Sequence, residues 1–281
     1  MAVATASRSQ RWKVLRRSPT FWVGGFLVLM WVVFAILGDF VTPYDPLGTP
    51  QDILNRLQPP SSEHWFGTDD LGRDVLSRVL AGASQVLTIA LGATVIGTLF
   101  GTAIGLVIGY YGGLVDDVVS RVLDAFLSIP LVITGMLALA ALGPNTIGVI
   151  IVIGLVFTPI IAKTVRAAVL GERQLDYVTA AQLRKENSFY ILFVEILPNV
   201  MSVVIVEFTV RLGYAIFTVL ALSFLGFGVN PTLPDWGVDI FRNYGFLTGN
   251  IWWPVLFPSL AIASLVVGVN LLADAIGQAF E

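Results

Sequence analysis

The sequence predicts an all-α polytopic membrane protein with six transmembrane helices. Of its 281 residues, 56% are hydrophobic and only 12% are charged, whereas a soluble domain is nearer a quarter charged. The mean hydropathy is +0.83. Several apolar segments approach or exceed the ~20 residues that cross the hydrocarbon core of a bilayer. Basic residues gather in the segments that this layout places on one side, so both termini are expected in the cytoplasm.

The first helix is expected over residues 21–40, after a basic start. Residues 1–20 hold no acidic residue and five basic ones: Arg8, Arg11, Lys13, Arg16 and Arg17. The apolar run is too long for the core of a signal peptide and lacks a clear A-x-A cleavage site. Residues 1–40 are therefore predicted to form a cytoplasmic amino terminus and an uncleaved membrane helix.

Residues 41–84 are predicted to be an extracytoplasmic segment, because they hold six acidic residues against three arginines. Its end, LGRDVLSRVLAG, has the stripe of an amphipathic helix that lies on the membrane surface. Asp74 and Arg78 are expected to pair at i,i+4 on its polar face. The aspartates of GTDDLGRD do not match the spacing of a calcium loop. Capping of a helix start is the favoured role for them.

The second and third helices are expected over 86–110 and 118–142. Glycines recur every four residues from Gly97 to Gly109 and form a ridge for close helix packing, which we expect within the chain rather than at a subunit contact. In the third helix, Arg121 and Asp124 are spaced for a mutual ion pair, and Pro130 predicts a kink.

The remaining helices are expected over 147–170, with a kink at Pro159, then up to about 227, with a start bent by Pro198, and over 253–272. The loop 229–250 lies outside in this layout. Its aromatic residues and those just after it fit an aromatic belt at the outer interface: Trp236, Tyr244, Trp252 and Trp253. The same loop would also suit a landing surface for a substrate-carrying protein, and both interpretations stay open.

The basic residues test this layout. Eleven are assigned inside: Arg8, Arg11, Lys13, Arg16, Arg17, Arg121, Lys163, Arg166, Arg173, Arg184 and Lys185. Four are assigned outside: Arg56, Arg73, Arg78 and Arg242. Arg211 is left within the membrane. The asymmetry supports cytoplasmic termini.

Residues 172–199 form the longest charge-bearing interruption in the second half of the chain. Asp176 is expected to cap a short helix that begins at Tyr177. Val178 and Ala181 then share one face, which the pair Ala180-Ala181 keeps thin enough to enter a groove on another protein. A polar loop between membrane helices and a docking helix for a soluble partner are both compatible with these residues.

Catalysis by this chain is not expected. The chain has no cysteine and a single histidine, His64, so disulfides, thiolate metal sites and histidine pairs are excluded. It has neither the phosphate-binding motif G-x-x-x-x-G-K-[ST] nor the nucleophile motif G-x-S-x-G. No metal site and no nucleic-acid partner are expected.

Ala180-Ala181, followed by Ile196-Leu197-Pro198-Asn199, resembles the EAA-type coupling motif of importer permeases in the ATP-binding-cassette (ABC) class. Further segments resemble the C type of permease (DppC/OppC type) in the dipeptide/oligopeptide/nickel importer family: HWFGTDDLGRDVLSRVLAGASQVL, SRVLDAFLSIP, LSFLGFGVNPTLPDWG and FPSLAIASLVVGVNLLADAI. The resemblance covers about residues 42–281. It implies a type I ABC importer (MetI-like) permease core of five helices over 85–281, plus the amino-terminal helix.

The resemblance also implies a coupling loop at 172–190. Its docking residues would be Asp176, Tyr177, Val178, Ala180, Ala181, Leu183, Arg184 and Lys185. The family usually has glycine where this chain has Lys185, and often histidine at the place of Glu195. The tight turn between the two short helices is therefore expected to be made differently, at Asn187. Near the carboxyl terminus, Asp274 resembles the aspartate of the family pattern. The arginine that follows it in the family is replaced here by Gly277.

The implied activity is that of a non-enzymatic permease subunit of an ATP-driven, binding-protein-dependent importer of di- or oligopeptides, working by alternating access. The implied partners are a sister permease in a heterodimer, two ATP-binding subunits that hold ATP and magnesium, and an extracytoplasmic peptide-binding protein. The expected location is a bacterial or archaeal plasma membrane.

Three alternatives remain. An importer of nickel or another metal chelate has a permease of the same family. A secondary transporter needs several ionisable groups within the membrane, and only Glu207 and Arg211 qualify. An intramembrane protease needs a nucleophile and a base, and the only histidine lies outside. Glu207 and Arg211 stand i,i+4 and are expected to pair, either as a lock to the sister subunit or as a polar lining of the translocation path.

Overall fold

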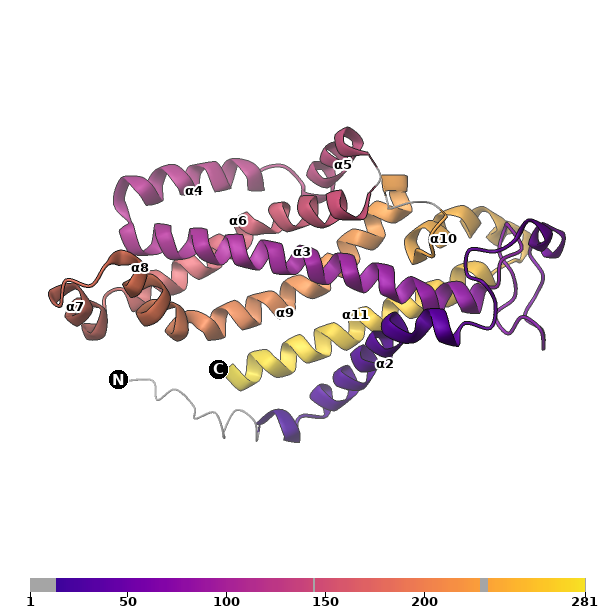
Figure 1. The fold of residues 1–281 in the computed structure, drawn as a ribbon, viewed down its shortest axis with the longest axis horizontal. Helices are drawn as coiled ribbons and strands as arrows, with labels where there is room; N and C mark the ends of the chain where they lie inside the picture. The colour runs from indigo at the N-terminus through magenta and orange to yellow at the C-terminus, as the bar shows by residue number, and fades with distance from the viewer. Residues whose placement is uncertain (1–13, 144, 228–231, 281) are drawn as a thin grey trace.

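The computed structural model describes residues 14–143, 145–227 and 232–280. They form an elongated helical bundle, with short helices projecting at one end and an irregular segment at the other (Figure 1). In chain order the elements are α2 (Pro19–Val41), η1 (Pro50–Asn55), α3 (Val75–Tyr111), α4 (Gly113–Leu127), α5 (Leu131–Leu142), α6 (Thr146–Glu172), α7 (Asp176–Leu183), α8 (Ser188–Tyr190), η2 (Ile191–Ile196), α9 (Leu197–Leu222), η3 (Ser223–Phe227), α10 (Trp236–Asn243), η4 (Tyr244–Gly249) and α11 (Trp253–Phe280).

Five helices in the described part of the chain are long and apolar enough to cross a membrane: α2, α3, α6, the continuous stretch from α8 to η3, and α11. A sixth span is formed if α4 and α5 are counted together. These two helices are bent by 84° at their junction, which is a break between two helices, whereas a kink within one helix was predicted at Pro130. Pro130 lies in extended backbone just before α5, where its missing N–H costs no helical hydrogen bond. The six-helix layout is confirmed in this form.

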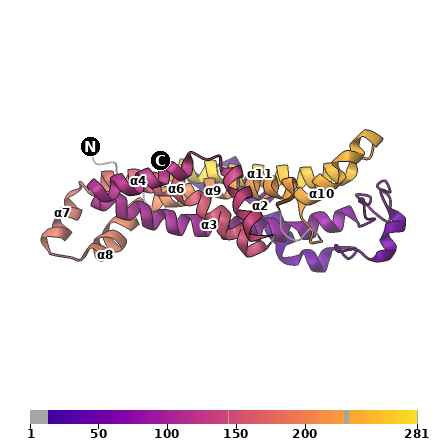
Figure 2. The same ribbon diagram turned by 90° about the horizontal axis from the view of Figure 1, so that it is seen from above.

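The glycine ridge of α3 packs on α6 within the same chain. A Cβ atom on Gly101 would lie 2.6 Å from Cβ of Ile161, and one on Gly105 would lie 2.7 Å from the backbone oxygen of Ala162. Because such distances are closer than real side chains allow, the two backbones approach only where glycine stands. The prediction of packing within the chain is confirmed, and α3 and α6 run side by side in both views (Figure 1 and Figure 2).

The amino-terminal helix α2 packs against α11, the last helix of the chain (Figure 1). Trp31 of α2 is buried and donates a hydrogen bond from Nε1 to Oγ of Ser264, at 2.9 Å. Its ring also meets the ring of Trp236 edge-on, with 4.9 Å between the centroids. The amino-terminal helix is thus attached to both α11 and α10.

The prediction of a surface helix at the end of residues 41–84 is wrong. Residues from Val75 onward are the first turns of α3, which runs without a break for 37 residues, and Val75 and Val79 are buried in the core. The expected boundary at residue 84 falls inside this helix. Asp74 does cap the helix start, as predicted, since its carboxylate accepts the N–H of Ser77 at 2.8 Å. Asp74 also bonds His64, at 2.9 Å, and does not form the predicted pair with Arg78.

The predicted aromatic belt is correct for only half of its members. Trp236 is fully buried and donates from Nε1 to the oxygen of Val79, at 2.9 Å. Trp253 is also buried and donates to the oxygen of Thr68, at 3.0 Å. Tyr244 and Trp252 are exposed, as a belt requires. Trp236 thus holds α10 against α3, and Trp253 holds α11 against the segment that precedes α3.

The start of the fifth span is irregular before Pro198 and not at it. Residues Ile191–Ile196 form a π-helical segment, and α9 then begins at Leu197 with the proline in its first turn. Pro159 lies inside the continuous helix α6. The beginning of α2 and the end of α11 lie toward the same end of the bundle as α7 (Figure 1). The predicted basic residues Arg8, Arg11 and Lys13 lie outside the described residues.

Candidate functional site

The segment singled out in the sequence, 172–190, forms the tip of the bundle (Figure 1). It contains α7, eight residues long, and the short helix α8. Asp176 is the first helical residue of α7 and its side chain makes no capping hydrogen bond, so the predicted cap is wrong. The exposed carboxylate still lies in the first turn, where the positive end of the helix dipole favours it.

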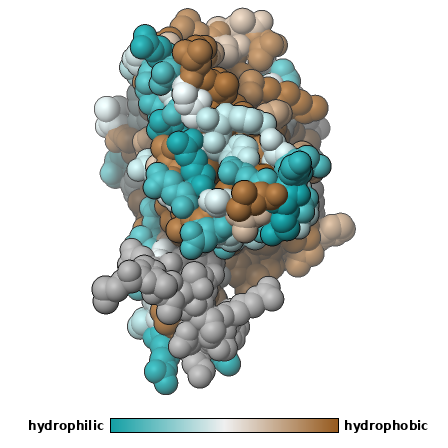
Figure 3. Space-filling model, turned by 90° about the vertical axis from the view of Figure 1, so that its left-hand side faces the viewer, coloured by the Kyte–Doolittle hydropathy of each residue, from teal (hydrophilic) through white to brown (hydrophobic). Residues whose placement is uncertain are grey.

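The face of α7 predicted to dock is turned inward. Val178 and Ala181 are fully buried and belong to the main hydrophobic core, because α7 packs against η2. The outward face carries Leu175, Thr179 and Leu183, which are spaced by four residues, together with Ala180. Leu183 is 79% exposed. Figure 3, which views this end of the molecule, shows apolar atoms bordered by hydrophilic ones.

The end of α7 forms a Schellman motif with a lysine at its centre. The N–H of Glu186 bonds the oxygen of Ala181 at 3.2 Å, and the N–H of Lys185 bonds the oxygen of Gln182 at 2.9 Å. Lys185 has a φ of 59°, the left-handed conformation that glycine adopts without strain. The turn is thus made at Lys185 itself, and the prediction of a turn at Asn187 is wrong. Asn187 instead caps α8, accepting the N–H of Tyr190 at 2.7 Å.

Polar contacts fasten this tip to the membrane helices. Arg184, at the end of α7, donates from Nη2 to Oε1 of Glu195, at 2.9 Å. Glu195, which stands where the family often has histidine, therefore binds the end of α7. The Tyr177 hydroxyl donates to Glu172 at 2.7 Å. Burial and this hydrogen bond to a carboxylate raise the pKa of Tyr177 above its ordinary value. Arg173 donates to the backbone oxygens of Gly109 and Tyr110, at 3.1 and 3.2 Å. These contacts join α7 to α6 through Glu172 and to η2 through Glu195, and they join the end of α6 to α3.

Glu207 and Arg211 form the predicted ion pair in α9. Arg211 Nε lies 2.6 Å from Glu207 Oε1, and the guanidinium lies 5.1 Å from the ring centre of Tyr214. Their side chains are 11% and 16% exposed. The pairing is confirmed, while the role in the path stays a prediction.

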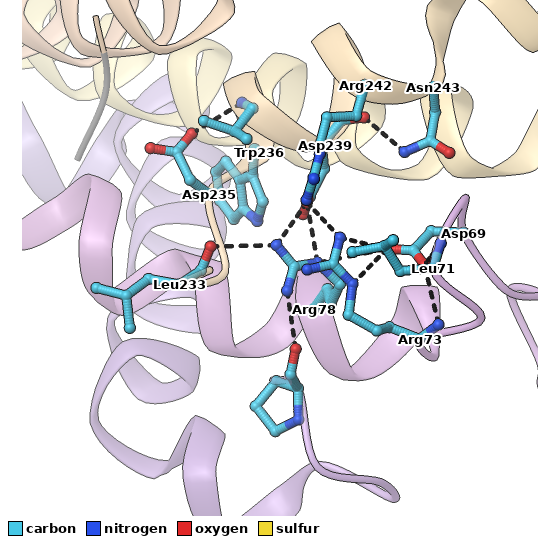
Figure 4. Close-up of polar contacts among 12 residues, drawn as sticks. Asp69, Leu71, Arg73, Arg78, Leu233, Asp235, Trp236, Asp239, Arg242 and Asn243 are labelled. Carbon is cyan, nitrogen blue, oxygen red and sulfur yellow. Dashed lines mark hydrogen bonds and ion pairs between the residues drawn. The ribbon is translucent and has the colours of Figure 1, made fainter. Parts of the chain in front are cut away.

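A buried charge network at the opposite end was missed by the sequence analysis (Figure 4). Arg78 donates to Asp239 of α10 and to the backbone oxygens of Pro46 and Leu233. Arg73 donates to Asp69 at 2.7 Å. The signal was the run of aspartates and arginines before α3, together with aspartates near the buried Trp236. Each group alone was typical of an exposed loop.

Comparisons with known proteins agree with this architecture. Residues 97–281 match the family described as the binding-protein-dependent transport system inner membrane component. Residues 8–60 match the amino-terminal membrane domain of oligopeptide transport permease C. Among solved structures, the chain is similar to the methionine ABC transporter MetNI in inward-facing conformations, with a TM-score of 0.57 and 18% identity, covering 73% of this chain and 96% of that one. That likeness concerns the fold.

Curated relatives cover almost the whole chain. The dipeptide transport system permease protein DppC of Alkalihalophilus pseudofirmus is 34% identical over 97% of this chain and 88% of its own length. The di/tripeptide transport system permease protein DppC of Pseudomonas aeruginosa is 36% identical, over 92% of this chain and 87% of its own length. The probable D,D-dipeptide transport system permease protein of Escherichia coli is 32% identical, over 94% and 87%. The chain therefore belongs to the inner-membrane permease components of binding-protein-dependent ABC importers, and within them to the C type that includes the dipeptide and oligopeptide permeases.

Proposed function

We propose that this chain is the permease subunit of an ATP-driven, binding-protein-dependent importer of di- and oligopeptides, which works by alternating access. The observation that supports this most directly is the tip formed by α7. It combines an outward apolar edge, Leu175 and Leu183, with an inner face locked into the core of the bundle. Such an element can both dock on a partner and pass on its movement.

The partners follow from this role. The complex would contain two ATP-binding subunits, which hold ATP and magnesium on the cytoplasmic side, and one of them would dock on α7. A sister permease would complete the membrane part as a heterodimer, and an extracytoplasmic peptide-binding protein would deliver cargo to the opposite end. Closure of the ATPase dimer would push on α7, and the contacts of Arg173 and Arg184 would carry the push to α3, α6 and η2.

Relatives of this chain include permeases of transport systems for dipeptides, for di- and tripeptides and for glutathione. These relatives favour a peptide cargo over nickel or another metal chelate. The asymmetry of basic residues supports an orientation with α7 and both termini in the cytoplasm.

Uptake and orientation are tested together. Cells that lack this chain should lose ATP-dependent accumulation of a labelled dipeptide, and the restored chain should return it. Single cysteines at Glu63 and Gln182, both exposed, can be labelled without interference because the chain has no cysteine. An impermeant thiol reagent on intact cells should label position 63 and not 182. The reverse pattern would contradict the orientation, and unchanged dipeptide uptake without the chain would contradict the function.

A further inference from the structure

Helix α4 has three distinct faces, and one of them is a stripe of polar side chains. Asp117, Arg121, Asp124 and Ser128 follow one another at spacings of four, three and four residues, so they share one side of the helix. All four are exposed. A second face, also exposed, is apolar and carries Leu114, Val118, Val122 and Phe126.

The third face attaches α4 to α6. Asp116 receives a bidentate contact from Arg166, with both N–O distances at 2.5 Å, and a hydrogen bond from Ser120 at 2.9 Å. Leu123 is buried beside it. Farther along, Lys163 of α6 forms an ion pair with Asp124. This pair replaces the predicted pair of Arg121 with Asp124, and it places Lys163 next to the polar stripe.

The stripe reaches into the membrane. A Cβ on Gly109, near the end of α3, would lie 3.1 Å from the backbone oxygen of Arg166, so the Asp116–Arg166 contact is level with the inner end of the helices. Asp124 lies eight residues beyond Asp116, or about 12 Å along α4 at ~1.5 Å per residue. The helix runs alongside α3 and α6 over this distance (Figures 1 and 2). With the α7 end in the cytoplasm, as proposed above, Asp124 lies about 12 Å farther from the cytoplasmic side than Asp116, beside the membrane-spanning helices α3 and α6.

The Lys163–Asp124 pair differs from the Glu207–Arg211 pair in the exposure of its side chains. The side chains of Lys163 and Asp124 are 36% and 60% exposed, whereas the chain itself covers most of the Glu207–Arg211 pair. An ionised carboxylate at membrane depth does not face lipid and instead meets water or protein. The apolar face of α4 is the one suited to lipid or to a neighbouring helix.

We propose that the polar stripe of α4, together with Lys163, forms one wall of the water-filled translocation path in its inner half and contacts the charged ends of the passing peptide. This inference rests on the proposed function. Asp117 and Asp124 would meet the ammonium end of a peptide, while Arg121 and Lys163 would meet its carboxylate. Two charges of each sign balance, so the wall attracts both ends without retaining either.

The first test measures access of water to each face. Single cysteines at Asp117 and Ser128, on the stripe, are compared with cysteines at Val118 and Val122, on the apolar face, in the assembled transporter in inside-out vesicles. A charged, impermeant thiol reagent should modify the stripe positions about tenfold faster or more, because only a hydrated thiol forms the reactive thiolate. Equal or faster labelling of the apolar face would overturn the proposal. Slow labelling of all four positions would also overturn it, since the stripe would then be covered by the sister subunit.

The second test separates lining from support. Neutralising the pair with Asp124→Asn and Lys163→Gln is compared with exchanging it, Asp124→Lys with Lys163→Asp, after confirming that both complexes assemble. A lining pair should change uptake unevenly between acidic, neutral and basic dipeptides, and the exchange should not restore the original preference. If the exchange fully restored uptake, and the neutralised variant affected all peptides equally, the pair would have only a structural role and the proposal would be overturned.

The Asp116–Arg166 pair supplies the matched control, because it lies on the packing face. Its neutralisation, Asp116→Asn with Arg166→Gln, should lower uptake of all peptides by the same factor. The labelling experiment needs no cargo, so its failure is distinguishable from failure of the proposed function, which would appear as absence of dipeptide uptake by the unmodified transporter.

Discussion

Arg78 and Asp239 lie 161 positions apart in the chain and form a buried ion pair, with 2.6 Å between Nη2 and Oδ1. Their side chains are only 2% and 5% exposed. The pair joins the first turn of α3 to α10 (Figure 4). It fixes α10 to the start of α3, beside the buried ring of Trp236.

Breaking this pair from one side should be costly. Arg78→Met leaves Asp239 buried without its main partner and is expected to lower the free energy of unfolding by about 3–5 kcal/mol. The double variant Arg78→Met with Asp239→Asn removes both charges and should recover most of that loss. Thermal unfolding in detergent of the natural chain, of Arg78→Met, of Asp239→Asn and of the double variant gives the coupling energy. Additive effects would show that the two residues do not act as a pair.

Stability should depend on pH through Asp235, which caps α10. Burial raises the pKa of its carboxyl above the ordinary value, opposed by hydrogen bonds from Ser223 and from the N–H groups of Val238 and Gly237, and by the nearby Arg78. The folded state then binds the proton more tightly than the unfolded state, so this group adds stability as pH falls through the raised pKa toward the unfolded value.

The isosteric Asp235→Asn variant serves as the reference for that effect. Its amide keeps the acceptor for the α10 backbone and can donate to Ser223, but it cannot titrate. At neutral pH the variant should unfold at the same temperature as the natural chain or at a higher one. As the pH is lowered toward about 4, the unfolding temperature of the natural chain should rise relative to that of the variant. A constant difference across that range would show that Asp235 does not titrate.

The left-handed lysine offers a stabilising substitution. Lys185→Gly removes the steric conflict at φ 59° and should raise the free energy of unfolding by up to about 1 kcal/mol. Thr179→Gly is the control, because Thr179 is exposed and lies within α7 at right-handed helical angles, so glycine there adds disorder to the unfolded chain without relieving strain. Thermal unfolding compares the two. A loss of stability in Lys185→Gly would mean that contacts of the lysine side chain outweigh the strain.

Neighbouring alanines of α7 should respond differently to the same change. Ala181→Asp buries a carboxylate without a partner in the core and should cost at least about 2 kcal/mol of folding stability. Ala180→Asp places the charge on the outward face and should change stability by less than about 0.5 kcal/mol. It should nevertheless weaken co-purification of the ATP-binding subunits and reduce uptake. Normal assembly and uptake with Ala180→Asp would remove the outward face of α7 from the docking surface.

The Glu207–Arg211 pair is tested by removing both charges at once. Glu207→Gln with Arg211→Met strands neither charge within the membrane. If the pair locks the helix to the sister subunit, the complex should loosen in detergent and uptake should fall equally for all cargoes. If it lines the path, assembly should persist and uptake should change unevenly between acidic, neutral and basic peptides. Intact assembly with unchanged uptake would contradict both roles.

The membrane spans were predictable because a backbone in lipid must bond within its own segment, so a spanning helix carries a long apolar run. The packing of α3 on α6 was predictable for a similar reason, since glycines four residues apart leave one side of a helix flat. Both signals are local. The Glu207–Arg211 pair also needed only the spacing along one helix.

The errors share a different cause. Arg78 has a polar partner 161 residues away, and no local pattern distinguishes it from a residue on the membrane surface. Helix α7 has two short apolar faces, one with Val178 and Ala181 and one with Leu175 and Leu183, and only its contact with η2 decides which turns inward. At Lys185, two backbone hydrogen bonds impose a conformation that lysine does not prefer.

The length of α3 has a mechanical consequence. At ~1.5 Å per residue its 37 residues form a rod of about 55 Å, longer than the hydrocarbon core, and the ridge between Gly97 and Gly109 is clamped to α6. Arg78 forms its ion pair near one end of this rod, and Arg173 binds the backbone oxygens of Gly109 and Tyr110 near the other. In a rigid rod that pivots about its middle, a movement of one end displaces the other end in the opposite direction.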